Sequence, residues 1–350
     1  MLKAGIIGYG YMGHFHYDKM LGFPEKVKPV AVYDIAEETR REAERKGMKI
    51  FDNIDDFLKE DMDLVVVATP NQWHAKYAVA AMNAGKNVMI EKPATMNVQE
   101  FEQIMECEKR TKKLFTVHQQ RRHDVDYRIV VDMIQSGELG NVTTIESRVF
   151  GERGVCFGWR GDPEYGGGML YDWGVHLIDQ MLQLFKGQKV VRIQARLESV
   201  LTPAVDDYVE VVMEFDSGTY AKVYISTFVL EKLPRWFVFG DRGTLMLEDF
   251  SGTKGGARKI RQEVKGFDSV RGKKNLGPSR TMAPLAPECI EILELPQEED
   301  ESFVYWENLL DALENKKEPE VKSKEILRVM QIVDAAFEAS KEKQVLEVNI

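Results

Sequence analysis

Short apolar runs alternate with charged, helix-like stretches through the first 118 residues of the chain. The runs read KAGII, PVAVY, LVVVA, NVMI and LFTV, and amphipathic or strongly charged stretches follow them. Buried strands that alternate with helices are typical of a parallel sheet covered on both faces. We therefore predict an α/β fold that opens with a doubly wound, Rossmann-type parallel sheet over residues 1–120.

The pattern changes after about residue 120, where longer strands of alternating polarity are joined by tight turns. Residues 208–215 and 219–228 flank a turn at 216–218, and residues 236–239 and 244–247 flank a turn at 240–243. Such pairs predict hairpins of an antiparallel sheet. We expect residues 121–350 to form an α+β domain with an open, mostly antiparallel sheet, which binds substrate and mediates oligomerisation. Its tail, residues 303–340, reads as two helices interrupted at Glu318-Pro319.

The composition is that of an ordinary globular protein and excludes a disordered chain. Apolar residues make up 44% of the 350 residues and charged residues 30%, and the formal net charge is −10. No apolar stretch approaches the roughly 20 residues that cross a bilayer. A glycine-rich turn arrives before a signal peptide could develop, so we expect a cytoplasmic protein. The acidic balance argues against nucleic acid and favours a small-molecule partner.

Two further features of composition bear on possible partners. The three cysteines are scattered without a CxxC pair, so we expect no disulfide framework and no metal site. Residues 251–280 are strongly basic, with nine Lys or Arg against two acids. This segment could be an arm that reaches an anionic ligand or a neighbouring subunit. We favour an irregular, solvated loop.

A GxGxxG motif lies between the first strand and the first helix, where a dinucleotide phosphate binds in this type of sheet. Gly8 permits the tight turn, Gly10 lets the backbone approach a pyrophosphate, and Gly13 lets helix and strand pack closely. Asp34 follows the second strand, 21 residues after Gly13, where a carboxylate meets the ribose hydroxyls. A carboxylate there would repel a 2′-phosphate, so NAD is favoured over NADP. The alternative is that Asp34 only ends a strand or caps the next helix.

Two more strands end in polar residues at the carboxyl edge of the sheet, the usual edge for ligands. One is followed by Thr69-Pro70-Asn71, which could contact the cofactor or simply build the turn, and by His74. We expect His74 to start a helix or lie at the surface rather than act in catalysis, and we expect His14 and His16 to serve packing or capping. The other strand is followed by Glu91-Lys92-Pro93. The proline holds Lys92 extended, which aims its ammonium group toward the nicotinamide.

Residues 166–179 carry the most informative stretch, GGGMLYDWGVHLID. The glycines let backbone approach a ligand closely, and Asp172 and His176 are spaced i, i+4 on what should be one helix face. A histidine oriented by a carboxylate can take a proton from an alcohol. The alternative is an ion pair that stabilises an exposed helix.

Together these motifs resemble the glucose-fructose oxidoreductase and inositol dehydrogenase family (Gfo/Idh/MocA). The similarity covers nearly the whole chain, and the combination of EKP with GGxxxDxGxHxxD is the specific part. The resemblance implies NAD-dependent oxidation of a secondary hydroxyl of a sugar, cyclitol or glycoside by a homo-oligomer. Carried over, it makes Lys92, Asp172 and His176 catalytic. His176 would take the proton, Asp172 would orient it, and Lys92 would hydrogen-bond the reacting oxygen.

The resemblance also extends the set of binding residues. Arg121, with Lys92, Asp172 and His176, is expected to bind substrate, although Gln119, Gln120 and His123 stand at positions that vary among members. Trp159 and Arg160 would lie near the cofactor or substrate, or could form an ordinary structural stack. The cofactor contacts are expected from Gly8, Gly10, Tyr11, Met12, Gly13, Asp34, Thr69, Pro70, Asn71, His74, Glu91, Lys92, Trp159 and Arg160.

Two other functions remain open at this point. The enzyme could regenerate its NAD in place, oxidising a sugar carbon so that a glycosidic bond leaves by elimination. A non-catalytic dinucleotide sensor is the third possibility, since fold alone does not determine function. Such a sensor would have no need of Lys92, Asp172 and His176 together.

Overall fold

A computed structural model describes residues 1–155, 158–261 and 282–350. Most of the basic segment 251–280 therefore lies outside the described residues. Its described part includes strand β13 (Gly255–Ile260), which pairs with β12 and β14, so the prediction of an irregular loop is wrong for these six residues.

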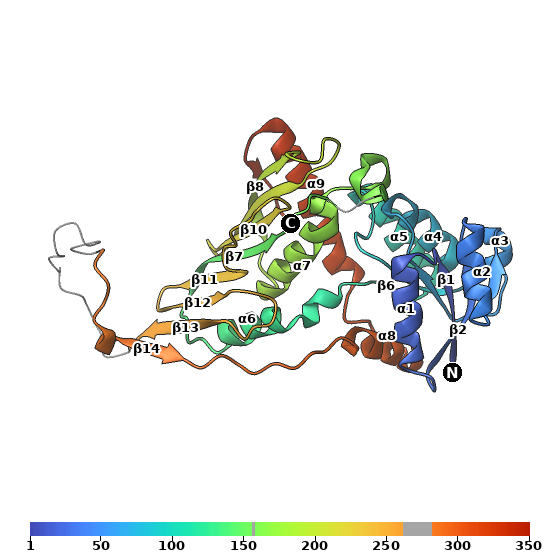
Figure 1. Ribbon diagram of the computed structural model, residues 1–350, viewed down its shortest axis with the longest axis horizontal. Helices are drawn as coiled ribbons and strands as arrows, with labels where there is room; N and C mark the ends of the chain where they lie inside the picture. The colour runs from blue at the N-terminus through green and yellow to red at the C-terminus, as the bar shows by residue number, and fades with distance from the viewer. Residues whose placement is uncertain (156–157, 262–281) are drawn as a thin grey trace.

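The first half of the molecule, residues 2–117, forms a six-stranded sheet in which all strands are parallel (Figure 1). Its spatial order is β3-β2-β1-β4-β5-β6. Strands β2 and β3 therefore lie on one side of β1, and β4, β5 and β6 lie on the other. This confirms the doubly wound sheet, although β3 was not among the predicted runs. The strands are β1 (Leu2–Ile7), β2 (Val27–Tyr33), β3 (Lys49–Phe51), β4 (Leu64–Val67), β5 (Asn87–Ile90) and β6 (Phe115–Val117).

Helices connect these strands and bury their apolar sides against the sheet. The four residues of β4 are fully buried, as their uninterrupted apolar sequence requires of a strand covered on both faces. The helices are α1 (Tyr11–Leu21), α2 (Glu37–Arg45), α3 (Ile54–Leu58), α4 (His74–Asn83) and α5 (Val98–Thr111).

The second sheet has nine strands in the order β14-β13-β12-β11-β7-β10-β9-β8-β15. The pair β10 and β7 is parallel and the other pairs are antiparallel, which confirms an open, mostly antiparallel sheet. Both predicted hairpins are present. The remaining strands are β7 (Val142–Phe150), β8 (Val190–Glu198), β9 (Tyr208–Phe215), β10 (Tyr220–Ser226), β11 (Trp236–Gly240), β12 (Gly243–Leu247), β14 (Ile290–Leu293) and β15 (Leu346–Glu347).

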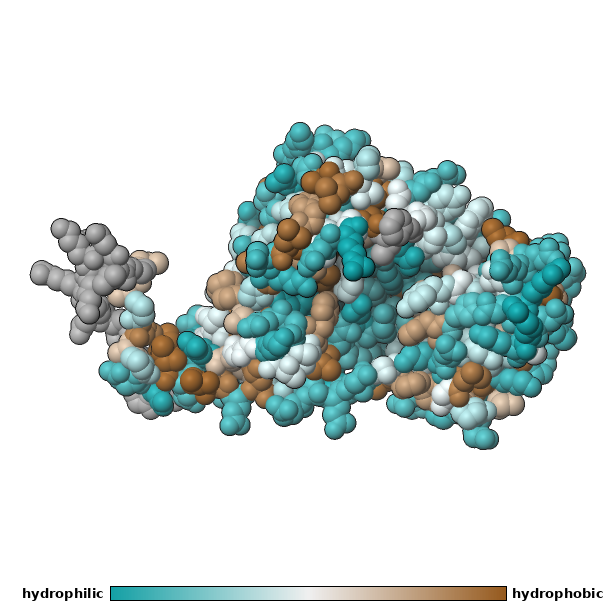
Figure 2. Space-filling model, in the orientation of Figure 1, coloured by the Kyte–Doolittle hydropathy of each residue, from teal (hydrophilic) through white to brown (hydrophobic). Residues whose placement is uncertain are grey.

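Helices α6 (Val125–Gln135), α7 (Val175–Leu184) and α9 (Ser323–Glu342) cover the inner face of the second sheet. Alternate residues of β9 are buried beneath them, as the period-two pattern predicts. No helix of the described residues covers the outer face, which shows apolar side chains among its polar ones. Ile292 on β14 is 77% exposed, and Figure 2 shows apolar residues gathered at this end of the sheet.

The C-terminal helices join the two halves of the molecule. Helix α8 (Val304–Asn315) and α9 are separated at residues 316–322, which confirms the predicted interruption. Trp306 and Leu310 of α8 pack into the hydrophobic core of the first sheet. Helix α9 contributes Ile326 to that core and Val333 to the core of the second sheet. Within the described residues, no helix combines the length and the hydropathy needed to span a membrane.

Candidate active site

A cavity of about 910 Å³ is lined by residues of both halves, at the carboxyl edge of the parallel sheet. Many of the predicted site residues line it. They are Gly8, Gly10, Tyr11, Met12, Asp34, Thr69, Pro70, Asn71, Glu91, Lys92, Arg121, Trp159, Arg160, Asp172 and His176. Gly13 and His74 are not among the lining residues.

The three glycines of the GxGxxG turn meet the requirements of a pyrophosphate site. Gly8 has a φ of +86°, and a Cβ there would lie 2.8 Å from the carbonyl oxygen of Ala68. A Cβ on Gly13 would lie 2.3 Å from the carbonyl oxygen of Gly8, so this glycine is needed for close packing of α1 against the turn. A Cβ on Gly10 would meet nothing within 4 Å. The space that a phosphate needs is therefore open above Gly10, at the N-terminus of α1.

Asp34 lies at the end of β2 with both carboxylate oxygens anchored by backbone. Oδ2 accepts a hydrogen bond from the Tyr9 amide at 2.7 Å, and Oδ1 accepts one from the Ala36 amide at 2.8 Å. The remaining lone pairs can accept hydrogen bonds from ribose hydroxyls at the cavity wall. Arg40 donates to the carbonyl oxygen of Asp34 and does not line the cavity. Lys76, whose role the sequence did not indicate, does line it and lies over the Trp73 ring.

Residues after β4 support the cavity wall from behind. Asn71 donates its side-chain amide to the Gly166 carbonyl at 2.8 Å, which ties the first half of the chain to the loop before Asp172. His74 is the first residue of α4, which confirms the expected helix start, and it is fully buried, so it does not lie at the surface. Its ring nitrogens contact the carbonyl oxygens of Pro93 (2.8 Å) and Thr69 (3.0 Å). His74 thus links the two loops that follow β4 and β5 and has no direct access to a ligand.

Lys92 and Asp172 form a partly buried ion pair between the two halves. Lys92 Nζ donates to Asp172 Oδ1 at 2.7 Å and to the Asp172 carbonyl oxygen at 2.8 Å. Arg160 Nε lies 3.6 Å from the same carboxylate oxygen. Burial would raise the pKa of Asp172, but the charges of Lys92 and Arg160 outweigh it and lower that pKa. Asp172 therefore stays ionised and holds the Lys92 ammonium group at the cavity.

His176 has a different partner from the predicted one. Its Nδ1 lies 2.6 Å from Gln119 Oε1, and the side chain is almost fully buried. Residues Leu170–Gly174 form a π-helical turn before α7, which breaks the expected i, i+4 geometry and directs Asp172 to Lys92. The prediction that Asp172 orients the imidazole is wrong. Burial, and then the charges of Lys92 and Arg121, hold the pKa of His176 well below its usual value, so the ring is neutral.

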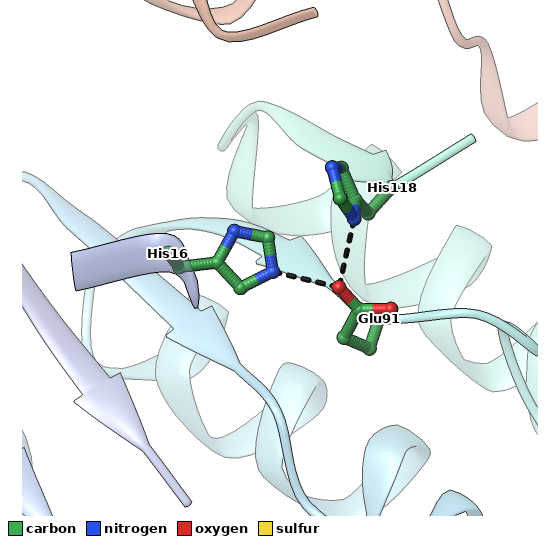
Figure 3. A group of neighbouring side chains, drawn as sticks. All are labelled: His16, Glu91 and His118. Atoms are coloured by element: carbon green, nitrogen blue, oxygen red, sulfur yellow. Dashed lines mark hydrogen bonds and ion pairs between the residues drawn. The ribbon is translucent and has the colours of Figure 1, made fainter. Parts of the chain in front are cut away.

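Glu91 is the centre of a buried network directly behind Lys92 (Figure 3). Its Oε1 lies 2.7 Å from His16 Nε2 and 2.8 Å from His118 Nδ1, and its Oε2 accepts the Lys92 amide at 3.2 Å. Burial would raise the pKa of Glu91, but the two imidazoles outweigh it and hold that pKa well below its usual range.

The ligand atoms of these three side chains lie close enough together to hold a metal ion. Their nitrogen–oxygen separations are hydrogen-bond distances, and we interpret the group as a hydrogen-bonded network that orients the Lys92 backbone. His16 was expected to serve packing or capping, and instead it contacts the carboxylate. His118 gave no local signal in the sequence.

The remaining predicted residues form an aromatic and cationic wall. The Arg121 guanidinium lies 4.0 Å from the centroid of the Trp173 ring and donates to Asp124 at 2.8 Å. Arg160 stacks on its neighbour Trp159 at 4.5 Å. Flat aromatic and guanidinium surfaces suit the ring faces of sugars and of nicotinamide. Further lining residues that the sequence did not indicate are Tyr33, Ile35, Thr39, Ala68, Trp73, Lys76, Tyr77, Gln120, Tyr165 and Trp173.

Comparison with known families places the chain in a defined class of proteins. Residues 2–119 match an oxidoreductase family with an NAD-binding Rossmann fold, which confirms the predicted cofactor. Residues 127–246 match the GFO/IDH/MocA C-terminal domain. The chain therefore belongs to the Gfo/Idh/MocA family, as its motifs predicted.

Individual relatives show how far the similarity extends. An oxidoreductase of Schizosaccharomyces pombe is 29% identical over 61% of this chain, and the match spans 60% of that relative's length. The scyllo-inositol 2-dehydrogenase (NADP(+)) IolW of Bacillus subtilis is 25% identical over 99% of this chain and 95% of its own. The crystal structure of an NAD-binding protein from Listeria innocua has a TM-score of 0.87 at 34% identity, covering 99% of this chain and 96% of that one.

Proposed function

We propose that this protein transfers hydride from a secondary hydroxyl of a sugar, cyclitol or glycoside to NAD. The observation that carries the proposal is the convergence of Lys92 from the first half and His176 from the second on the cavity that the glycine-rich turn also lines. One wall can hold a dinucleotide, and the other presents a neutral imidazole and an ammonium group. Oxidation of an alcohol needs both.

The cofactor's pyrophosphate fits the open space above Gly10, and its adenosine ribose fits beside Asp34. When bound, NAD supplies the hydride acceptor. Lys92 lines the same cavity as the glycine-rich turn, at the same edge of the sheet, so it would lie on the nicotinamide side of a bound cofactor.

His176 serves as the general base that takes the hydroxyl proton. Nε2 is the nitrogen for this task, since Nδ1 is occupied by Gln119. A neutral, buried imidazole can accept a proton without first losing one. Positioned proton transfer of this kind contributes roughly 10²- to 10⁴-fold to rate.

Lys92 stabilises negative charge that develops on the reacting oxygen. Two of its three ammonium hydrogens have partners in Asp172, which leaves one donor for the substrate. Asp172 orients Lys92 and keeps the substrate side of the cavity from carrying an uncompensated charge. Donors fixed in advance toward a developing oxyanion lower the barrier because they need no reorganisation during the reaction.

Two observations support the substrate class. The lining residues from the second half of the chain combine aromatic side chains, such as Trp173 and Tyr165, with hydrogen-bonding side chains, and this combination suits a polyhydroxylated ring. The match to IolW, a scyllo-inositol 2-dehydrogenase, covers nearly the whole length of both chains. Both favour a sugar or cyclitol over an apolar alcohol.

The test is a screen of polyols, sugars and glycosides with NAD and with NADP, read by absorbance of the reduced cofactor. NADH formed in proportion to substrate supports the proposal. Product without net NADH indicates that the cofactor is regenerated in place and that a glycoside is cleaved by elimination. Sugar binding without turnover across the whole panel contradicts the proposal and favours a dinucleotide sensor.

Asp34 provides a separate test of cofactor choice. Asp34→Ser removes a charge-assisted acceptor, so the Kd for NAD should rise by about tenfold or more while NADP gains relative to NAD. Calorimetry with each oxidised cofactor measures both. A wild-type protein that prefers NADP would contradict this role of Asp34.

We also propose that the protein is a homo-oligomer that buries the outer face of the nine-stranded sheet. Phe239 is 38% exposed and Ile292 is 77% exposed on this face, and open sheet faces of this kind favour association. Sedimentation equilibrium tests the proposal, and a monomer at micromolar concentration contradicts it.

A further inference from the structure

Gln119 occupies an unusual position between the two halves of the molecule. It follows β6 directly and is only 2% exposed, yet its side chain reaches across to helix α7 of the second half. Gln119 Oε1 lies 2.6 Å from His176 Nδ1, a short hydrogen bond. A buried amide in contact with a proposed general base can control where that base carries its proton.

The second contact of the amide determines which of its ends faces the imidazole. Gln119 Nε2 donates to the backbone carbonyl of Val175 at 3.5 Å. Exchanging oxygen and nitrogen would place two acceptor oxygens 3.5 Å apart, so this contact favours the orientation in which the amide oxygen faces the ring. An amide oxygen only accepts hydrogen bonds. His176 Nδ1 therefore carries the hydrogen.

Burial and the charges around His176 disfavour protonation of its second ring nitrogen. Lys92 approaches from the loop after β5 and Arg121 from the turn after β6, and both disfavour a positive imidazole. Glu91 favours one, but it is engaged by His16 and His118. Asp172, four residues before His176, is bound to Lys92, and Asp179, three residues after it, is bound to Arg122.

We propose that Gln119 is a positioning residue that holds the His176 imidazole in the Nδ1–H tautomer, so that Nε2 presents its lone pair to the substrate hydroxyl. The catalytic consequence rests on the proposed function, whereas the tautomer itself does not. An amide provides this orientation without the charge of a carboxylate. His176 consequently remains an uncharged base over a wider pH range than a histidine paired with Asp or Glu would.

The tautomer is measured directly, without substrate. Protein labelled with ¹⁵N-histidine is examined by long-range ¹H–¹⁵N correlation near pH 7.5, and the His176 signals are assigned by their loss in His176→Gln. A protonated Nδ1 and an unprotonated Nε2 support the proposal. A protonated Nε2 overturns it, even if the protein proves to be an active dehydrogenase.

Two variants then test the effect on catalysis once a substrate is known. Gln119→Glu places a carboxylate on Nδ1, and the pKa of His176 should rise by about one unit or more. The acidic limb of the kcat/KM profile should move to higher pH by the same amount. Gln119→Met removes the acceptor at similar volume and should lower kcat about tenfold or more, with little change in the Kd for NAD.

Gln194→Glu is the matched control, because it makes the same chemical change on an exposed residue of β8. Its pH profile should follow that of the wild type. An unshifted profile in Gln119→Glu, with folding verified by circular dichroism and NAD affinity retained, would overturn the positioning role. If no substrate turns over, the NMR result still decides the tautomer, so failure of the proposed function is distinguished from failure of this inference.

Discussion

The protein has two buried histidine environments, and they differ in the side chain that bonds the imidazole. His16 and His118 both contact the Glu91 carboxylate, whereas His176 contacts the Gln119 amide. His118 and Gln119 are consecutive residues. The end of β6 therefore contributes to both environments at once.

We expect the carboxylate environment to stabilise structure and the amide environment to preserve the reactivity proposed for His176. Glu91 gains two imidazole partners and orients the Lys92 amide, which fixes the loop that carries the ammonium group. His176 has a neutral partner and one nitrogen without a described partner, so it can accept and release a proton. The comparison shows how burial alone does not decide whether a histidine is structural or chemical.

The largest effect is expected on the amide side. His176→Ala should lower kcat/KM by roughly 10²- to 10⁴-fold, because it removes the proposed general base. The Kd for NAD should change little, since His176 lies on the wall away from the glycine-rich turn. Steady-state kinetics and calorimetry measure the two quantities. His14→Ala, which alters a partly exposed histidine of α1, is the control and should retain activity. An active His176→Ala would erase the functional difference between the two environments.

The carboxylate side is expected to respond in stability. Glu91→Gln removes the charge that two buried imidazoles share, and we expect a loss of about 3 kcal/mol in the free energy of unfolding. Urea denaturation measures it. Glu42→Gln is the matched control, because Glu42 pairs with His14 at 2.8 Å with its side chain 43% exposed. That loss should be much smaller, because solvent screens the exposed pair. Equal losses in the two variants would mean that burial adds nothing to the Glu91 network.

Acid should destabilise the protein through its buried imidazoles. Burial lowers the pKa of His16, His74 and His176, so the folded protein excludes protons that the unfolded chain binds below about pH 6.5. The free energy of unfolding should therefore fall as pH drops from 6.5, by up to about 1.4 kcal/mol per pH unit for each of these groups. The pKa of Glu91 is lowered in the folded protein, so further stability is lost as the pH falls below the ordinary pKa of a glutamate. Urea denaturation between pH 5 and 8 measures the slope, and a slope unchanged in His74→Gln would contradict the contribution of that ring.

The smallest effect is expected at Arg160. Its Nε lies 3.6 Å from Asp172 Oδ1, compared with 2.7 Å for Lys92 Nζ, and its side chain is 29% exposed. A partly solvated pair at this distance contributes at most about 1 kcal/mol, so Arg160→Met should lower kcat/KM by about fivefold or less. Lys92→Met should cost far more. If the two losses were equal, Asp172 would depend on Arg160 as much as on Lys92.

Much of the architecture could be predicted because it depends on local patterns. The uninterrupted run at 64–67 is recognisable as a buried strand, and the turns at 216–218 and 240–243 mark hairpins. Gly8, Gly13 and Asp34 are recognisable because the geometry of one strand, turn and helix requires them at fixed spacing. The short strand β3 was not predicted, since three residues leave too little periodicity to detect.

Partners of the site residues could not be predicted in the same way. Spacing along the chain placed Asp172 beside His176, but the π-helical turn and the nearby ammonium group of Lys92 gave the carboxylate a different partner. Gln119 stands 57 residues from His176, and His16 stands 75 residues from Glu91. Neither pair leaves a periodic or spacing signal.

The sequence by itself determined the two sheets, the dinucleotide turn and many of the residues that line the cavity, because propensity, periodicity and motif spacing act over a few neighbouring residues. Only the tertiary structure decided that an amide holds His176 and a carboxylate holds His16 and His118. Those contacts depend on which side chains the packed helices and sheets bring within hydrogen-bond distance, and a buried polar group must take whichever partner the fold places there.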